Sequence, residues 1–303
     1  MDQEIAWPEK TREIQNFLMD STYWNGFEFR DDDIVVGTYQ KSGTTLVQQI
    51  LAQFIFDGET HGMPVADISP WLDLRLPPLE VKLPDIVAQK HRRFLKTHLP
   101  VDALVYSPKV KYIYIARDGR DVAWSLFNHH HAFNDVFYKA INELPKFGPV
   151  LERPTTDDPH EYFLQWMKDG CYPFWPFWEN VRSWWEIRDL PNMYLLHFQT
   201  LIDDLEGEMR RIADYLDFEI DESKWDQMVY HCSFDYMKNN ATLSTPLGGT
   251  VFEGGAQSFV YKGTNKRWQG VLTDEDIANY EARALKELGP ECAHWLATGQ
   301  FLK

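Results

Sequence analysis

A lysine, a glycine and two threonines stand together at the point where a buried strand gives way to a helix. Lys41, Gly43, Thr44 and Thr45 follow the β-branched run 34–36, and apolar residues then recur at helical spacing. A strand, a tight turn and a helix start direct several backbone N–H groups and the positive end of the helix dipole at one point. Together with the ammonium and hydroxyl groups, this pattern predicts an anion-binding loop.

The loop alone does not define its ligand. Gly-Thr turns between a strand and a helix also occur in α/β proteins that bind no phosphate. The stretch departs from the Walker pattern G-x-x-x-x-G-K-[ST], because Lys41 precedes Gly43 and no Gly-Lys pair follows. The neighbouring motifs therefore decide between an ordinary turn and an anion site.

A histidine and a lysine close the second predicted strand, residues 93–99. His98 has a reference pKa of about 6.5, which suits proton transfer near neutral pH. Lys96 lies two residues earlier and so points to the same face of the strand. If this strand neighbours the first one in a parallel sheet, both side chains lie beside the anion loop. The alternative for Lys96 is a solvent-facing position.

Strands and helices alternate along the chain, which predicts a single α/β domain over residues 1–303 with a central parallel sheet flanked by helices. Polar residues gather at the carboxyl ends of the strands, where open parallel sheets bind ligands. Thr273 and Asp276 form a capping-box pattern that opens the last helix. The predicted strands cover residues 34–36, 93–99, 110–116 and 193–198, and the predicted helices cover 10–19, 44–56, 122–130, 177–185, 203–218, 221–237 and 274–288.

The overall charge and the cysteine content restrict the class of protein. A net charge of -16 argues against nucleic acid or an anionic membrane as a partner, while local positive charge can still bind a small anion.

Cys171, Cys232 and Cys292 have no C-x-x-C spacing, which supports neither a disulfide framework nor a zinc site. The N-terminus lacks a signal-peptide layout, and no apolar run approaches the roughly 20 residues of a membrane span. We expect a cytoplasmic protein with no transmembrane segment.

Five short motifs follow one another in an order that resembles the cytosolic-type sulfotransferases. They are TYQKSGTT, KTHLP, ARDGRDVAWS, SFDYM and YKG ahead of a tryptophan, and they span Thr38 to Thr273. Members of this family use 3′-phosphoadenosine 5′-phosphosulfate (PAPS) as donor, and their chemistry needs no metal. Sulfuryl transfer spreads negative charge over the sulfuryl and leaving phosphate oxygens, so positioning and electrostatic stabilisation dominate, with a base for the acceptor proton.

The resemblance implies a role for each matching residue. His98 would be the general base, Lys41 would stabilise the leaving phosphate, and Lys96 would help to bind the sulfonate. The other implied donor contacts are Ser42, Gly43, Thr44 and Thr45 at the 5′-phosphate, Arg117, Ser125, Tyr261, Lys262 and Gly263 at the 3′-phosphate, Ser233, Phe234 and Met237 at the adenine, and Phe198. The implied acceptor is a small molecule.

Several positions depart from the family pattern. Tyr261 stands where an arginine is usual, Leu46 where a tryptophan is usual, and Phe198 where a tyrosine is usual. Our hypothesis is that Lys266 or Arg267 replaces the missing positive charge. The family's dimerisation motif is not recognisable, so the sequence leaves the oligomeric state open.

Two segments are candidates for the walls of an apolar acceptor site. The aromatic segment 162–185 and the Pro-rich connector 63–84 are expected to form these walls, which favours a hydroxylated hydrophobic small molecule or a lipid as acceptor. Most of the aromatic residues are nevertheless expected to form core, and the alternative for the connector is a surface loop.

Three consecutive histidines, residues 129–131, suggest a metal site at first sight. Consecutive helical residues cannot all face one ion, and no matching set of acidic or cysteine ligands accompanies them. We therefore interpret them as a helix end that borders the acceptor pocket.

Two other functions remain compatible with an anion loop. An ATP-dependent small-molecule kinase would need a Walker lysine and a magnesium-binding acid, and the displaced Lys41 speaks against it. A non-catalytic nucleotide-binding module would keep the loop without the chemistry, and the presence of Lys96 and His98 in one motif speaks against that.

Overall fold

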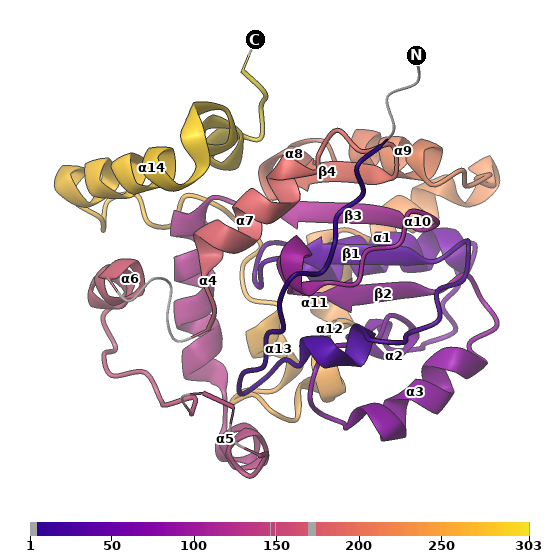
Figure 1. Ribbon diagram of the computed structural model, residues 1–303, viewed down its shortest axis with the longest axis horizontal. Coiled ribbons are helices and arrows are strands. Elements are labelled where there is room, and N and C mark those ends of the chain that lie inside the picture. The colour runs from indigo at the N-terminus through magenta and orange to yellow at the C-terminus, as the bar shows by residue number, and fades with distance from the viewer. Residues whose placement is uncertain (1–4, 146, 149, 169–173, 303) are drawn as a thin grey trace.

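Four parallel strands form the centre of the fold in a computed structural model that describes residues 5–145, 147–148, 150–168 and 174–302. The strands are β1 Ile34–Thr38, β2 Phe94–Thr97, β3 Lys111–Ala116 and β4 Met193–His197. Their order in the sheet is β2-β1-β3-β4, and every pair is parallel (Figure 1). The four predicted strands and the α/β fold class are confirmed.

The first strand has apolar side chains on both of its faces because helices cover both faces of the sheet. Ile34 and Val36 pack on one side in a cluster with α1 (Thr44–Ile55), whereas Val35 packs on the other side in the cluster that contains α7 (Phe177–Glu186). Gly37 belongs to the second face, where a Cβ atom would collide with the Trp184 ring. The absence of a side chain at Gly37 therefore lets α7 approach the sheet closely.

The remaining helices surround this sheet. They are α2 Val65–Ile68, α3 Leu79–Ala88, α4 Gly119–Ala132, α5 Asp135–Asn142, α6 Pro159–Lys168, α8 Phe198–Asp203, α9 Leu205–Tyr215, α10 Trp225–His231, α11 Phe234–Asn239, α12 Ala241–Ser244, α13 Ala256–Phe259 and α14 Asp274–Thr298. Short 3₁₀ turns are η1 Ser21–Trp24, η2 Val101–Ala103, η3 Glu222–Lys224 and η4 Pro246–Gly249. Figure 1 shows α4 standing at one end of the strands with α5 and α6 outside it, while α2 and α3 lie beside β2.

The predicted helix over residues 10–19 is wrong, because this stretch is irregular. The side-chain oxygen of Asn16 accepts hydrogen bonds from the amides of Leu18 and Met19, at 2.9 and 2.7 Å. Such local side-chain bonds compete with helical backbone bonds. Met19 also forms a bridge with Leu74, so the segment is held by tertiary contacts.

Two further helix predictions are corrected in their limits. The predicted helix 221–237 is broken into η3, α10 and α11, because the Ser233 side chain accepts from the Tyr236 amide at 3.2 Å and starts a new helix. The last helix extends to Thr298 and kinks at Gly289, which has a φ of 74°. Its capping box between Thr273 and Asp276 is confirmed.

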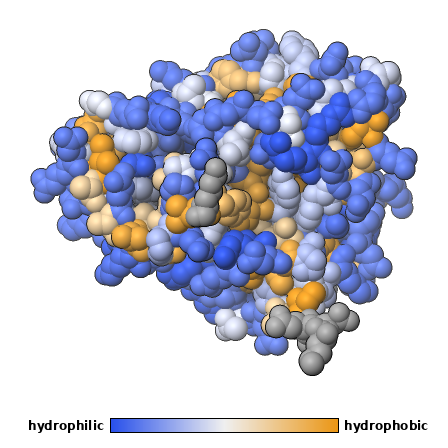
Figure 2. Space-filling view, turned by 90° about the horizontal axis from the view of Figure 1, so that it is seen from above, coloured by the Kyte–Doolittle hydropathy of each residue, from blue (hydrophilic) through white to orange (hydrophobic). Residues whose placement is uncertain are grey.

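The outer surface agrees with the acidic composition. Figure 2 shows a face that is mostly hydrophilic, with hydrophobic residues gathered in smaller patches. Within the described ranges, no helix is both long enough and apolar enough to cross a membrane. Cys232 and Cys292 are buried and free, and Cys171 lies outside the described residues.

Candidate active site

The carboxyl ends of β1, β2 and β3 open into one cavity of about 1040 Å³. Lys41 comes from the loop after β1, His98 follows β2, and Arg117 follows β3. Because the three strands are parallel neighbours, these residues are brought together at the same edge of the sheet. The predicted neighbourhood of the second strand and the anion loop is confirmed.

Most of the predicted site residues line this cavity. The lining includes Lys41, Gly43, Thr44, Thr45, Lys96, His98, Arg117, Ser125, Phe198, Phe234, Met237, Tyr261, Lys262 and Gly263. Ser42 and Ser233 are not among the lining residues. Ser42 is fully buried in the loop, and Ser233 caps α11.

The loop after β1 has the geometry of an anion cradle. Gly43 precedes α1 with a φ of 113°, and a Cβ atom there would lie 2.7 Å from the Phe198 ring. Only glycine fits this combination of backbone angle and space. No side chain caps the start of α1, so the first-turn amides of Thr44 and Thr45 have no capping oxygen. Among the described residues, the buried Ser42 hydroxyl also has no hydrogen-bond partner.

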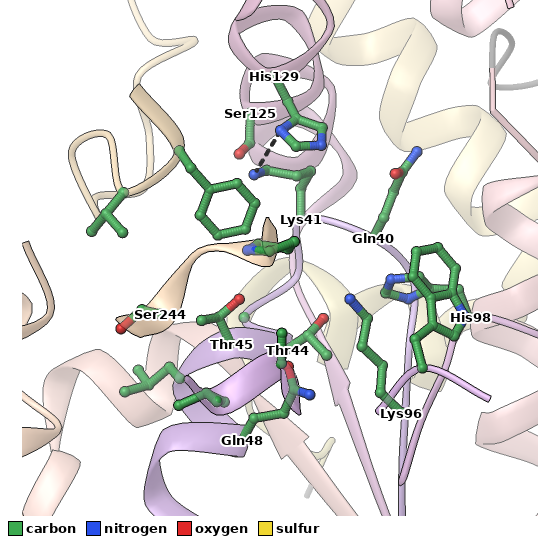
Figure 3. A pocket seen from close by; sticks show the side chains of 18 of the residues that line it. Gln40, Lys41, Thr44, Thr45, Gln48, Lys96, His98, Ser125, His129 and Ser244 are labelled. Carbon is green, nitrogen blue, oxygen red and sulfur yellow. Dashed lines mark hydrogen bonds between the residues drawn. The ribbon is translucent and has the colours of Figure 1, made fainter. Parts of the chain in front are cut away.

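Lys41 extends from this loop into the cavity with a left-handed backbone, at a φ of 65°. Its ammonium lies 3.5 Å from His129 Nδ1 and 4.5 Å from the centre of the Phe259 ring (Figure 3). Burial, together with the charges of Arg117 and Lys96, lowers the pKa of Lys41 to about 7. An anion bound in the cavity would oppose this shift, because it favours the charged ammonium.

His98 presents one imidazole nitrogen to the cavity. Its Nδ1 lies 2.8 Å from the Thr38 carbonyl oxygen, which can only accept, so Nδ1 carries the proton and Nε2 is left as an acceptor. Burial and the positive charge of Lys96 hold the pKa of His98 well below its usual range. The imidazole is therefore neutral near pH 7 and able to take a proton at Nε2.

Lys96 lies on the same side as His98, as the alternation along β2 predicts. Its ammonium stands 4.5 Å from the centre of the Trp71 ring. Burial lowers the pKa of Lys96 to about 8. Figure 3 shows Lys96 and His98 on the side of the cavity across from Ser125 and His129, which α4 supplies.

Arg117 ties the loop after β1 to the segment 261–267. Its guanidinium donates to the Lys41 carbonyl at 3.1 Å, to the Thr264 carbonyl at 3.0 Å and to Asn265 Oδ1 at 2.7 Å. The Phe198 ring lies under it at 4.6 Å. Burial lowers the pKa of Arg117 to about 10, which leaves it charged at neutral pH.

The two candidate replacement cations on the 261–267 segment point to different places. Arg267 lines the cavity, whereas the exposed Lys266 does not. The Lys266 amide donates to Asp121 at 2.6 Å, and burial raises the pKa of that carboxyl to about 6. Only Arg267 of the pair faces the other cations of the site.

The three histidines separate according to their positions on α4. His129 lines the cavity, in agreement with the prediction of a bordering helix end, whereas His130 and His131 contact the carbonyl oxygens of Glu152 and Thr156 at 2.7 and 3.0 Å. The described residues contain no group of three or more His, Cys, Asp or Glu that could hold a metal ion.

The aromatic segment 162–185 does not wall the cavity, so this prediction is wrong for its described part. Its described rings are mostly buried core instead, and one of them, Trp175, packs against the His98 imidazole with 5.6 Å between ring centres. Trp184 stacks on Tyr114 at 5.2 Å and donates to the Leu99 carbonyl at 3.0 Å. Large aromatic rings are buried where a helix packs on a sheet, as α7 does here, and no described residue of the segment lines the cavity. Pro173 lies outside the described residues.

The apolar walls come from three other parts of the chain. The connector supplies one wall, which supports its interpretation as part of a pocket and not as a plain surface loop. The other walls come from the α4–α5 junction and from residues 246–259. Their apolar side chains include Trp71, Leu74, Leu76, Ile86, Phe133, Phe137, Ile141, Leu247, Phe252 and Phe259.

Sequence reasoning missed several residues that contact the site. Trp71 packs on His98 and Lys96, Phe259 packs on Lys41, and Asn265 bonds to Arg117. Asn265 could have been found as the second residue after the YKG motif. Trp71 and Phe259 lie in irregular segments without periodicity, so no local pattern marks them.

The comparisons with known proteins identify the family of this chain. A family described as "Sulfotransferase domain" matches residues 31–289, and the chain therefore belongs to the sulfotransferase family. It is similar to Sulfotransferase 1B1 of Mus musculus, with 30% identity over 86% of this chain and 84% of that protein. It is also similar to "Glycolipid sulfotransferase" of Mycobacterium bovis, with 28% identity over 97% of this chain and 96% of that protein.

Solved structures show the same fold. Retinol dehydratase in a complex with retinol and PAP (3′,5′-adenosine bisphosphate) has a TM-score of 0.70 and 24% identity, over 88% of this chain and 84% of that chain. Mouse sulfotransferase SULT7A1 complexed with PAP has a TM-score of 0.69 and 21% identity, over 91% of each chain. The enzyme class, sulfotransferase, follows from the family match and the named relatives.

Proposed function

We propose that this enzyme transfers a sulfuryl group from PAPS to a hydroxyl or amine of a hydrophobic acceptor, with His98 as general base and Lys41 stabilising the leaving phosphate. One observation carries the proposal. A neutral imidazole with its Nδ1 proton fixed on Thr38 shares one cavity with Lys41, Lys96 and an uncapped helix start. A base and a concentration of positive charge are the two requirements of sulfuryl transfer.

The residues of the cavity fit PAPS as donor. Burial lowers the pKa values of Lys41 and Lys96, and the buried Ser42 hydroxyl lacks a partner among the described residues. An anionic ligand would relieve both conditions. PAPS would supply an activated sulfuryl group and two sites of negative charge.

Three groups of residues would hold this donor. The loop 41–45 would bind the 5′-phosphate through its amides and hydroxyls. Arg117 and Ser125, with residues 261–263, would bind the 3′-phosphate, and Arg267 would supply the charge that Tyr261 lacks. The adenine would lie against Phe234 and Met237, which Ser233 supports by capping α11.

The chain's own residues then divide the chemistry. His98 Nε2 takes the proton of the acceptor, and the Thr38 carbonyl stabilises the imidazolium that forms. Lys41 and Lys96 offset negative charge that develops between acceptor and leaving group. The apolar walls exclude water and hold the acceptor.

A hydrophobic or lipid acceptor is supported by two observations. The part of the cavity away from the loop is lined by aromatic and aliphatic side chains from the connector, α5 and residues 246–259. Several relatives are named glycolipid sulfotransferases, and they align over nearly the whole chain. The family match also favours sulfuryl transfer over the kinase and binding-module alternatives.

A transfer assay with radiolabelled PAPS tests this proposal. The acceptor panel would contain a long-chain alcohol, a sterol, a glycolipid and a small polar phenol, each with wild-type enzyme, His98→Asn and the control His131→Asn. We expect labelled product with the hydrophobic acceptors, almost none with His98→Asn, and normal amounts with the control, because His131 does not line the cavity. Equal turnover by His98→Asn would overturn the assignment of the base, and product from the polar phenol alone would overturn the acceptor class.

A further inference from the structure

The segment 69–74 runs along the outer edge of β2 and places one tryptophan beside the site. The Lys96 amide donates to the Pro70 carbonyl at 3.0 Å, and Trp71 forms a parallel bridge with Lys96. Because β2 is an outer strand of the sheet, this bridge extends the sheet by one short segment. Trp71 is thereby fixed relative to Lys96 and to His98 two residues further on.

The Trp71 indole touches Lys96 of β2 and His98 directly after it, the two side chains from this strand end that the proposed function uses. Its ring centre lies 4.6 Å from that of His98, at an interplanar angle of 81°. The Lys96 ammonium lies 4.5 Å from the centre of the same ring. An aromatic face attracts a cation, and an edge-to-face neighbour restricts how an imidazole can tilt. The position of Trp71 therefore sets the surroundings of both groups.

A fully buried carboxylate holds this indole in place. One oxygen of Asp73 accepts from Trp71 Nε1, and the other accepts from Trp24 Nε1 at 2.8 Å. An indole N–H can only donate, so both carboxylate oxygens act as acceptors. Thr97 adds a further hydrogen bond to the carboxylate. The Lys82 ammonium binds the same turn through the Trp71 carbonyl, at 3.2 Å.

The charge of Asp73 also acts on two neighbouring ammonium groups, those of Lys96 and Lys82. Burial lowers the pKa of Lys96 to about 8, and the negative charge of Asp73 opposes this shift. The other titratable groups that act electrostatically with Lys96 are His98, on the same side of the cavity, and Lys41 and His129. None of these supplies a negative charge near pH 7.

Building on the proposed function, we propose that Asp73 is a positioning residue for sulfuryl transfer: it fixes the Trp71 indole against His98 and provides a counter-charge for the Lys96 ammonium. Asp73 does not line the cavity. It acts on the reacting groups through Trp71, which does.

Two matched variants separate this role from a purely structural one. Asp73→Asn keeps the shape of the side chain and removes its charge. Trp24→Phe removes the other indole donor of Asp73, whose ring packs on Phe27 and Phe29. The measurements are kcat and KM with PAPS, PAP affinity by calorimetry, and the titration of the Lys96 ammonium by heteronuclear NMR in the free protein.

For Asp73→Asn we expect kcat to fall about 30-fold, PAP affinity to change less than about threefold, and the Lys96 titration to move about one pH unit lower. Trp24→Phe should change kcat by less than about threefold and leave the Lys96 titration unmoved. The double variant Asp73→Asn, Trp71→Phe should be little worse than the worse single variant, because the two residues act as one unit.

An unchanged Lys96 titration, together with equal kcat losses in Asp73→Asn and Trp24→Phe, would overturn the proposal. If Asp73→Asn does not fold, Trp71→Phe still tests the link, because it keeps a ring and loses the N–H that meets Asp73. Failure of the wild-type enzyme to transfer sulfuryl would count against the proposed function alone. In that case the titration of Lys96 in Asp73→Asn still tests whether Asp73 acts as a counter-charge for Lys96.

Discussion

The two ends of the cavity are built in different ways. The end that contains Lys41, His98 and Arg117 is formed by residues directly at the carboxyl ends of three neighbouring strands. The apolar walls are formed by the connector, by α5 and by residues 246–259, none of which belongs to the four strands, although Trp71 and Phe259 from these walls reach the charged end. The sheet thus fixes where charge stands, whereas segments outside the sheet fix the shape that receives the acceptor. Substitutions at the charged end should therefore change kcat or PAP affinity, whereas substitutions at the apolar end should change which acceptor is preferred.

The largest expected effect comes from removing the base at the strand end. His98→Asn should lower kcat by about 10³-fold, because general base catalysis contributes about this much. PAP affinity and acceptor KM should change less than about threefold, since the apolar walls and the loop stay intact. Steady-state kinetics measures kcat and the acceptor KM, and calorimetry measures PAP affinity. A variant with more than a tenth of the wild-type kcat would show that the base lies elsewhere.

The next effect is a pH dependence that belongs to the charged end alone. Lys41 has a pKa of about 7 in the free enzyme, so its charge is present below that pH and is lost as the pH rises through it. Loss of the Lys41 charge should therefore lower kcat/KM for PAPS about 25-fold between pH 6.5 and pH 8.5, and loss of the Lys96 charge, whose pKa is about 8, should add about fourfold. No loss is expected on the acid side near pH 6.5, because the pKa of His98 is held well below that value.

A matched variant tests whether Lys41 is responsible for this fall in kcat/KM at alkaline pH. Lys41→Arg keeps a positive charge at position 41 over the whole range, so the alkaline loss should shrink to the roughly fourfold part that comes from Lys96, even if the overall rate is lower. A wild-type kcat/KM that stays constant to pH 9 would contradict the assignment.

The next smaller effect is a loss of PAP affinity, expected on substitution of Arg267 but not of Lys266. Arg267→Ala should weaken PAP binding about tenfold, because it removes a charge that faces the cavity. Lys266→Ala should weaken it less than about twofold, because that side chain is exposed and does not line the cavity. Calorimetry at one salt concentration compares the two. Equal losses would mean that both lysine and arginine reach the ligand.

The smallest effect is expected at the apolar end. Phe137 lines the cavity and stacks on Phe133 at 3.7 Å. Phe137→Ala should shift the ratio of kcat/KM between long and short acceptors by about fivefold, with PAP affinity unchanged, since only apolar contact is lost.

Trp166→Phe is the control for this acceptor test, because Trp166 is fully buried core outside the cavity. It should lower the melting temperature and leave the acceptor ratio as it is. A change of ratio in this control, without one in Phe137→Ala, would reassign the acceptor wall to the aromatic segment.

The difference between the two ends of the cavity also explains which parts of the site could be predicted from the sequence. The strand, loop and helix around Lys41 are local signals, since the β-branched run, Gly43 and the helical periodicity act within about twenty residues. The strand ends at His98 and Arg117 follow from the rule for parallel sheets. These parts of the site were predicted correctly in position.

The parts that failed depend on tertiary packing. The segment 162–185 is rich in tryptophan, but composition does not tell core from pocket wall, and Trp184 is core because Gly37 leaves it space on the sheet. The predicted helix over 10–19 is overridden by Asn16 and by a bridge to Leu74, a residue more than fifty positions away. Contacts of this kind have no local signature.

The most direct test of the account is a calorimetric titration of the purified protein with PAP and, separately, with ATP, both without added metal. We predict that PAP binds more tightly than ATP, and that Lys41→Ala and Arg117→Ala each weaken PAP binding by at least about tenfold. Such a result would establish the strand-end cations as the donor site. ATP binding as tight as PAP binding, or PAP binding that both variants leave intact, would contradict the assignment of this cavity to PAPS.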